Sequence, residues 1–199
     1  MRLIKENLYD IVRLYIFQIG IMIFSLFLYM PIGFIEDETL FTQLRVIASI
    51  GAVIFYFVLV YSMMWEMGAK DKLKIDGGRL KAQPHKGLVL GLCANVPNFL
   101  LGILATVFAA ICASGAGINI QNTFAIIFLI TGMHGAMYLG IIQIVTPFPV
   151  VGDLTNYSNY LVQSILYIVI PLISVAVVHF SYYLGTKEKK LFGFLSKKK

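Results

Sequence analysis

The hundred residues from 87 to 186 contain no lysine and no arginine, although the 199-residue chain has sixteen of them. All sixteen lie in residues 2–86 or 187–199, and Asp153 carries the one full charge between these two regions. Basic residues clustered beside apolar stretches usually lie against anionic lipid. The composition agrees, since 59% of the residues are hydrophobic and the mean hydropathy is +0.83. We therefore interpret the basicity as membrane topology and expect no nucleic-acid partner.

The apolar residues fall into five long segments, and a helix needs about 20 of them to cross a bilayer. Inside lipid, a helix satisfies its own backbone hydrogen bonds. We therefore predict an all-α transmembrane bundle in which residues 1–199 form a single integral membrane domain. The first segment lacks a small-residue cleavage site and is interpreted as an uncleaved span. The five segments lie at about 11–34, 44–65, 87–113, 122–146 and 160–184.

The placement of the basic residues indicates how many segments cross. Five crossings would divide lysine and arginine almost evenly between the two sides, whereas an even number leaves Arg45 alone outside. The positive-inside rule favours the even number. We expect a plasma-membrane protein with both termini, the polar loop 66–86 and the basic tail 185–199 in the cytoplasm. Its Lys187–Lys199 tail then binds anionic inner-leaflet lipids.

One segment must therefore fail to cross, and 122–146 is the best candidate. Its centre reads T-G-M-H-G, and each half of about ten residues covers only about 15 Å as a helix, half of the hydrocarbon thickness. Both flanks lack lysine and arginine, so both can be external. The sequence predicts four full spans plus this broken or re-entrant segment; five full spans is the alternative.

His134 lies at the centre of that segment, in uncharged surroundings, with Tyr138 one turn later. An ionisable residue within a membrane segment is a candidate functional site, and broken helices at the membrane midplane form solute sites in many transporters. The simpler interpretation is that neutral His134 hydrogen-bonds a neighbouring helix or lies at the external interface.

Asn95 and Asn98 flank Pro97 and form a polar, kinked patch in the third segment. Proline removes one backbone donor, and asparagine satisfies the backbone groups that this leaves free. The alternative is that both asparagines share a polar lining with His134. Two series of small residues at four-residue spacing predict close helix packing. These are Gly132, Ala136 and Gly140, and Gly87 with Gly91.

The loop 66–86 contains candidate contacts for a cytoplasmic partner in Glu66, Asp71 and Arg79. The alternative is that these three charges pair with one another. The run from Asp76 to Gly78 predicts a tight turn or a short hairpin, because glycine tolerates positive φ.

The run W-E-x-G-x-x-D from Trp65 to Asp71, followed by Gly78-Arg79, resembles a pattern in uncharacterised small multi-pass membrane proteins of Gram-positive bacteria. The Tyr183-Leu184-Gly185 run before the lysine tail is similar to those chains too. The resemblance implies the bacterial plasma membrane and no particular activity.

The chain has no H-E-x-x-H, no paired glutamates on a span, no G-x-S-x-G and no glycine-rich phosphate loop. We expect a non-enzymatic protein, and nothing in the sequence indicates a cofactor or a metal ion. The sequence favours a scaffold or accessory subunit of a membrane complex, with another membrane protein as its partner. The alternative is a small transporter or substrate-binding component whose site lies near the helix break at 131–135.

Overall fold

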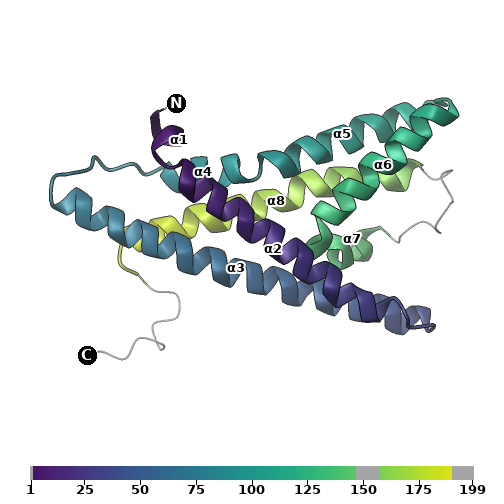
Figure 1. Cartoon of the computed structure of the whole chain (residues 1–199), viewed down its shortest axis with the longest axis horizontal. Helices are drawn as coiled ribbons and strands as arrows, with labels where there is room; N and C mark the ends of the chain where they lie inside the picture. The colour runs from purple at the N-terminus through teal and green to yellow at the C-terminus, as the bar shows by residue number, and fades with distance from the viewer. Residues whose placement is uncertain (1, 147–156, 190–199) are drawn as a thin grey trace.

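A computed structural model describes residues 2–146 and 157–189, which form a bundle of helices with no strand among them (Figure 1). Asp153 and most of the predicted basic tail lie outside the described residues. The elements are α1 (Arg2–Glu6), α2 (Leu8–Ile32), α3 (Glu38–Asp76), α4 (Lys86–Ala94), α5 (Val96–Ala113), α6 (Ile118–His134), the 3-10 turn η1 (Ala136–Tyr138), α7 (Leu139–Val145) and α8 (Tyr157–Thr186).

Four helices, α2, α3, α5 and α8, are long and apolar enough to cross a membrane. The segment after α5 divides into α6 and the η1–α7 pair, which meet at an angle of 79° at Gly135. The predicted all-α bundle with four spanning helices and one broken segment is therefore confirmed. This is the architecture of a multi-pass membrane protein.

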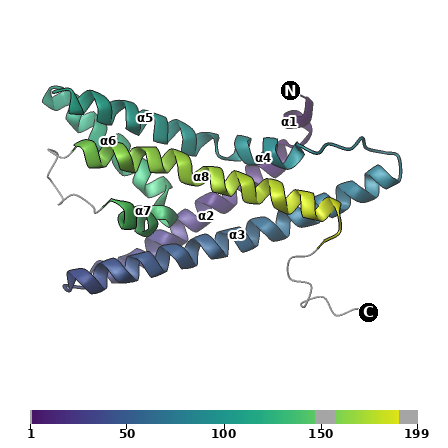
Figure 2. The ribbon, with the colours of Figure 1, turned by 180° about the vertical axis from the view of Figure 1, so that it is seen from behind.

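The broken segment enters and leaves at the same end of the bundle. Near the start of α6, the ring of Phe124 packs on Tyr157 and Tyr160 in the first turn of α8, with centroids 6.1 and 5.4 Å apart. After the break, the amide of Gln163 lies 3.5 Å from the carbonyl of Thr146 at the end of α7. Both ends of the segment thus lie beside the beginning of α8, as Figure 2 also shows. We call this the re-entrant end.

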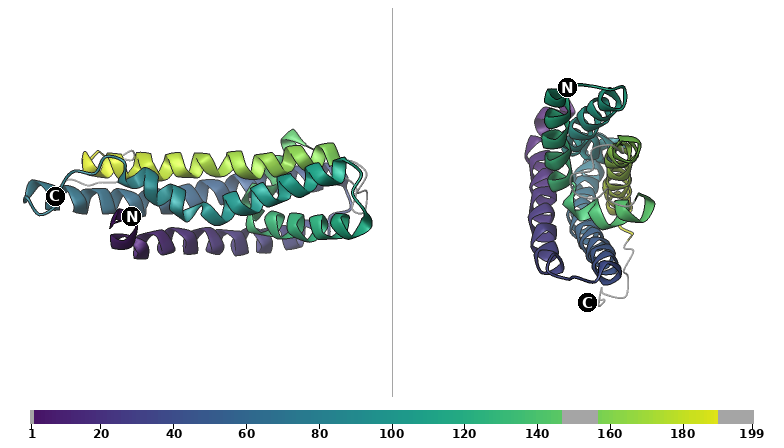
Figure 3. Two further views of the ribbon diagram at one scale, coloured as in Figure 1. Left: turned by 90° about the horizontal axis from the view of Figure 1, so that it is seen from above. Right: turned by 90° about the vertical axis from the view of Figure 1, so that its right-hand side faces the viewer.

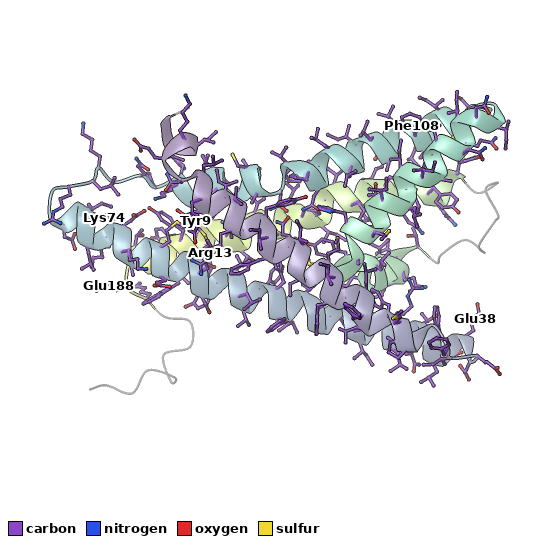
Figure 4. All side chains as sticks on the ribbon, in the orientation of Figure 1. Tyr9, Arg13, Glu38, Lys74, Phe108 and Glu188 are labelled. Carbon is purple, nitrogen blue, oxygen red and sulfur yellow. The ribbon has the colours of Figure 1, made fainter. Side chains whose placement is uncertain are left out.

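The basic residues of the described chain gather at the opposite end, called here the basic end. The indole of Trp65 donates to the carbonyl of Lys189 (2.8 Å), which joins the end of α8 to α3. Figure 4 shows Arg13 and Lys74 toward this end and Glu38 at the other. Figure 3 shows that α1 and the last turn of α8 also share it. Arg45 lies near the re-entrant end, with its carbonyl against Gly140 of α7.

The predicted loop 66–86 is wrong over its first half, because α3 continues as a helix to Asp76. No proline or glycine pair interrupts the chain before Gly77, and Glu66 and Lys70 form an i,i+4 ion pair (2.7 Å) that supports the helix. The expected tight turn follows, with Gly78 at φ +69°. The third segment begins at Lys86 and is interrupted at Asn95, so 87–113 comprises two helices.

Glycines bring α4 and α5 close to α8, as predicted for Gly87 and Gly91. A Cβ on Gly87 would lie 2.9 Å from the Cα of His179, and one on Gly91 would lie 3.2 Å from the Cα of Val175. The series Gly132, Ala136 and Gly140 does not form one packing face, because the helix bends between its first two members. Of its two glycines, Gly140 alone meets the backbone of another helix.

Candidate polar site at the re-entrant break

A hydrogen-bonded network of side chains joins four helices at the centre of the bundle. Gln18 donates to Tyr56 (3.1 Å) and to the side-chain oxygen of Asn95 (3.0 Å). Asn98 donates to Gln18 and to Asn95, each at 3.0 Å. The hydroxyl of Tyr56 also contacts that of Ser174 (3.0 Å). All five side chains are buried, so the network fixes how α2, α3, α5 and α8 face one another.

The side chain of Asn95 contacts both the backbone of α4 and the central network. Its backbone lies between α4 and α5, and its side-chain amide donates to the carbonyl of Gly91 one turn back (2.9 Å). Its side-chain oxygen accepts from Gln18 and Asn98. The residue therefore adds a second hydrogen bond to a backbone carbonyl of α4 and also places an acceptor in the central network.

A small cavity lies beside the network, at the point where α6 ends. Its volume is about 10 Å³, roughly the room of one water molecule. Asn98, His134 and Tyr138, three of the four residues predicted for a polar site, line it. Asn95 is one hydrogen bond away, through Asn98. The other lining residues are Leu101, Thr131, Gly135, Tyr167 and Pro171.

Three polar atoms of this lining are buried without a hydrogen-bond partner in the described structure. They are Nε2 of His134 and the hydroxyls of Tyr138 and Tyr167. The two tyrosines are only 2% and 3% exposed. Each buried and unpaired polar group costs about 1–3 kcal/mol, so three around one cavity call for a functional explanation.

The backbone at the break is held by α2 and α3. The N–H of Gly140 donates to Oγ of Ser49 (2.7 Å), and the hydroxyl of Tyr29 donates to the carbonyl of Ala136 (3.0 Å). Tyr29 and Ser49 are themselves hydrogen-bonded (2.6 Å). Irregular backbone at membrane depth persists only where protein or a lined cavity satisfies it, and here protein does so.

Sequence reasoning missed Tyr167, Gln18 and Tyr56. Gln18 could have been identified from the sequence, since it is the only amide side chain in the first apolar segment. The two tyrosines could not, because they are two of eleven and nothing in their spacing separates them from the rest.

The candidate cytoplasmic contacts are arranged differently from the prediction. Asp71 is 3% exposed and forms a buried ion pair with Lys86 (2.7 Å), so it is not available to a partner. Glu66 pairs with Lys70, and Asp71 with Lys86, so the alternative in which Glu66, Asp71 and Arg79 pair with one another is wrong. Glu66 and Arg79 are exposed, as a contact surface requires.

The two sequence runs that resemble other membrane proteins, Trp65–Asp71 and Tyr183–Gly185, lie where α3 crosses α8. A Cβ on Gly68 would overlap the carbonyl of Tyr182, and one on Gly185 would overlap the carbonyl of Trp65. One turn further along α3, the hydroxyl of Tyr182 donates to Asp71 (3.0 Å). The W-E-x-G-x-x-D run and the Y-L-G run are thus two sides of one helix contact.

The fold and this site together define a multi-pass helical bundle with a buried, uncharged polar cluster at the tip of a re-entrant segment. No protein-family model, curated protein or solved structure matches the chain. Within residues 2–146 and 157–189, no group of three or more His, Cys, Asp or Glu could hold a metal ion.

Proposed function

We propose that this chain is a small solute-binding or transport component of the plasma membrane, with its site at the helix break around residues 131–135. The observation that carries the proposal is the set of three buried, unpaired polar atoms, from His134, Tyr138 and Tyr167, around one cavity. Buried polar groups are usually paired, and three of the six unpaired ones in the described chain gather around this one cavity. Half-helices that end near the middle of a bundle are also the usual construction of solute sites in transporters.

The chemistry of the lining favours a small, uncharged, hydrogen-bonding solute. The lining has no Asp, Glu, Lys or Arg, and burying an ion without a countercharge is costly. Tyrosine hydroxyls both donate and accept, and a neutral imidazole nitrogen does one or the other. A solute with a few hydroxyl or amide groups matches these partners, and it requires an open form of the site, because the cavity in this structure has room for about one water molecule.

The proposed orientation follows from the two ends of the bundle. The basic end faces the cytoplasm and its anionic lipids, and the re-entrant end faces outward. The resemblance of the Trp65–Asp71 run to Gram-positive membrane proteins favours a bacterial plasma membrane.

The test is solute flux into proteoliposomes, followed by stopped-flow light scattering with glycerol or urea as the probe. We expect faster flux of at least one probe than in protein-free vesicles, and a return to the protein-free rate in His134→Ala and in the double variant Tyr138→Phe/Tyr167→Phe. Thr123→Ala is the matched control, because this exposed α6 hydroxyl only donates to its own helix. Equal rates in protein-free and wild-type vesicles for both probes would reject the proposal.

A second candidate function, an accessory subunit of a membrane complex, is favoured by the last turns of α3. Leu73 is 69% exposed there, between the exposed lysines Lys70 and Lys74. A cleft of about 480 Å³ at the same end, lined by Lys72, Ile75 and Lys187 among others, offers a partner both apolar and charged groups. The double variant Lys70→Gln/Lys74→Gln would then disrupt a co-purifying complex, while His134→Ala would have no effect on it.

A further inference from the structure

The interior of the bundle is layered between the central network and the basic end. On α3, buried Tyr56 is followed by apolar Val60 and Met64 and then by buried Asp71. On α8, the order is Ser174, Val178 and Tyr182. Both helices therefore pass from a polar level through an apolar level to a second polar level.

The other two helices at this end repeat the order in the opposite chain direction. On α4, Lys86 precedes Leu90, and Asn95 follows. On α2, Leu14 lies between Asn7 and Gln18. The shared middle level, called here the apolar layer, is no more than 1% exposed and belongs to one contiguous core cluster. It consists of Leu14, Val60, Met64, Leu90 and Val178.

The polar level beyond the apolar layer is centred on the ion pair of Asp71 and Lys86. The carboxylate accepts from the hydroxyl of Tyr182, and the ammonium lies 5.9 Å from the centroid of the same ring. These contacts tie α3, α4 and α8 together at a single point. On the outer side of the pair lies a cleft of about 250 Å³ that Arg13 and Glu66 also line.

The pair thus separates a charged cleft from the apolar layer, and the apolar layer separates the pair from the central network. A buried ion pair contributes little net stability, because desolvation offsets the attraction, yet losing one partner leaves an uncompensated buried charge. Such a charge is relieved when water enters, so loss of either partner favours hydration of the apolar layer.

The helix that carries Lys86 is suited to move as a unit. α4 has nine residues, begins after the turn at 77–85 and ends at the interruption at Asn95. Its face toward α8 contains Gly87 and Gly91, which pack directly on α8, so no α4 side chain at these two positions has to move past α8, but the close backbone contact must be broken when α4 moves. Short connecting or terminal positions commonly serve as hinges.

We propose that the Asp71–Lys86 pair, together with the apolar layer, is the cytoplasmic gate of the central site, and that α4 opens it by moving about Asn95. This inference rests on the proposed solute-binding function and adds how access to the site is controlled. In the structure described here the gate is closed.

The test measures whether the apolar layer can be reached from the cytoplasmic side. A Val178→Cys reporter, in a background with Cys93→Ala and Cys112→Ala, is exposed to a membrane-impermeant maleimide in inside-out vesicles. We expect little labelling with the native pair. With Asp71→Asn, which leaves buried Lys86 unpaired, we expect labelling to rise about tenfold or more, which corresponds to ~1.4 kcal/mol in the closed–open equilibrium. With Lys86→Met we expect a smaller rise, because Lys74 lies 3.8 Å from Asp71 and still offsets part of its charge. The double variant Asp71→Asn/Lys86→Met should regain protection, since no uncompensated charge remains.

Two controls test whether a change in labelling is specific to the proposed gate. Lys70→Gln removes a charge from the exposed pair with Glu66 and should leave Val178→Cys protected. An Ala109→Cys reporter, in the core near the re-entrant end, should stay unlabelled in every variant that keeps its fold. Unchanged labelling of Val178→Cys in both single variants would overturn the gate. Labelling of Ala109→Cys in both would also overturn it, because the pair would then be a structural brace.

The labelling readout needs no solute, so it separates the two proposals. Loss of protection in the single variants, without any glycerol or urea flux in wild type, would reject the proposed solute function and leave a closure element that serves another role. Flux that depends on His134, together with unchanged labelling, would reject the gate alone.

Discussion

Gly68 and Gly185 face each other where α3 crosses α8, and a Cβ added to either would lie 3.0 Å from the Cα of the other. The backbones of the two helices are in direct contact there. Small residues at such crossings are how membrane helices approach closely in the absence of a hydrophobic driving force. The same crossing positions Asp71 against Tyr182 and Lys86, so it also sets the geometry of the proposed gate.

Substitution at this crossing should therefore destabilise the protein. For Gly68→Ala or Gly185→Ala we expect a loss of about 1–3 kcal/mol, typical of an overpacked contact. Thermal or detergent-induced unfolding of the purified protein measures it.

Gly51→Ala is the matched control on α3, because nothing lies within 4 Å of the added Cβ. A helical glycine replaced by alanine at an open site gains about 0.5–1 kcal/mol. Equal stability of Gly68→Ala and Gly51→Ala would contradict the close crossing.

The central network gives a second prediction, which concerns coupling between residues. Gln18→Leu and Asn98→Leu each leave a buried partner unpaired, so each single variant should lose about 1–3 kcal/mol. Because the two side chains share a hydrogen bond, their effects should fail to add by about 0.5–3 kcal/mol in a double-mutant cycle. Unfolding of the wild type, both single variants and the double variant provides the measurement. Strict additivity would show that the two amides act independently.

The sequence predicted those features of the fold that depend on the residues of a single segment. Apolar length identified the spans, and the break at Gly135 lies within the predicted range 131–135. The basic residues other than Arg45 were expected on one side, and in the described chain they lie toward the basic end, whereas Arg45 lies near the re-entrant end. Each of these features follows from local composition and helix geometry.

Contacts between segments could not be predicted from the sequence. The pairing of Asp71 with Lys86 could not be predicted while 66–76 was interpreted as a loop, since a charged run without an apolar face gives no helical signal. Tyr167 joined the site only because α8 packs beside the break. Such pairings depend on helix packing, which one sequence does not encode as a local pattern.

The re-entrant course of α6 and α7 gives a third prediction, about sidedness. Ser114→Cys, at the end of α5, and Ser158→Cys, at the start of α8, are both exposed at the re-entrant end. Both should react with an impermeant maleimide added to intact cells, because the segment between them does not cross the membrane. Leu73→Cys should react only after the inner face is opened. Reaction of Ser114→Cys and Ser158→Cys from opposite sides would show a full crossing and contradict the re-entrant arrangement.

The contact that holds the break gives a fourth prediction. Ser49 accepts from the N–H of Gly140 and is hydrogen-bonded to Tyr29, so Ser49→Ala leaves a backbone donor unpaired in the interior. We expect a loss of about 1–3 kcal/mol in detergent unfolding. We also expect Tyr138, which follows the break directly, to lose its fixed position, so glycerol or urea flux should fall as well.

Ser62→Ala is the control, because this exposed hydroxyl on the same helix donates only to the carbonyl of Val58 in its own turn. Both variants remove one hydroxyl from α3, so helix propensity and size change equally, and the difference between them isolates the bond to Gly140. If Ser49→Ala and Ser62→Ala unfold at the same detergent concentration, the irregular backbone at the break does not depend on α3 for its hydrogen bonds. The position of His134 and Tyr138 would then have to be fixed by the packing of Gly135 against the ring of Tyr167 instead.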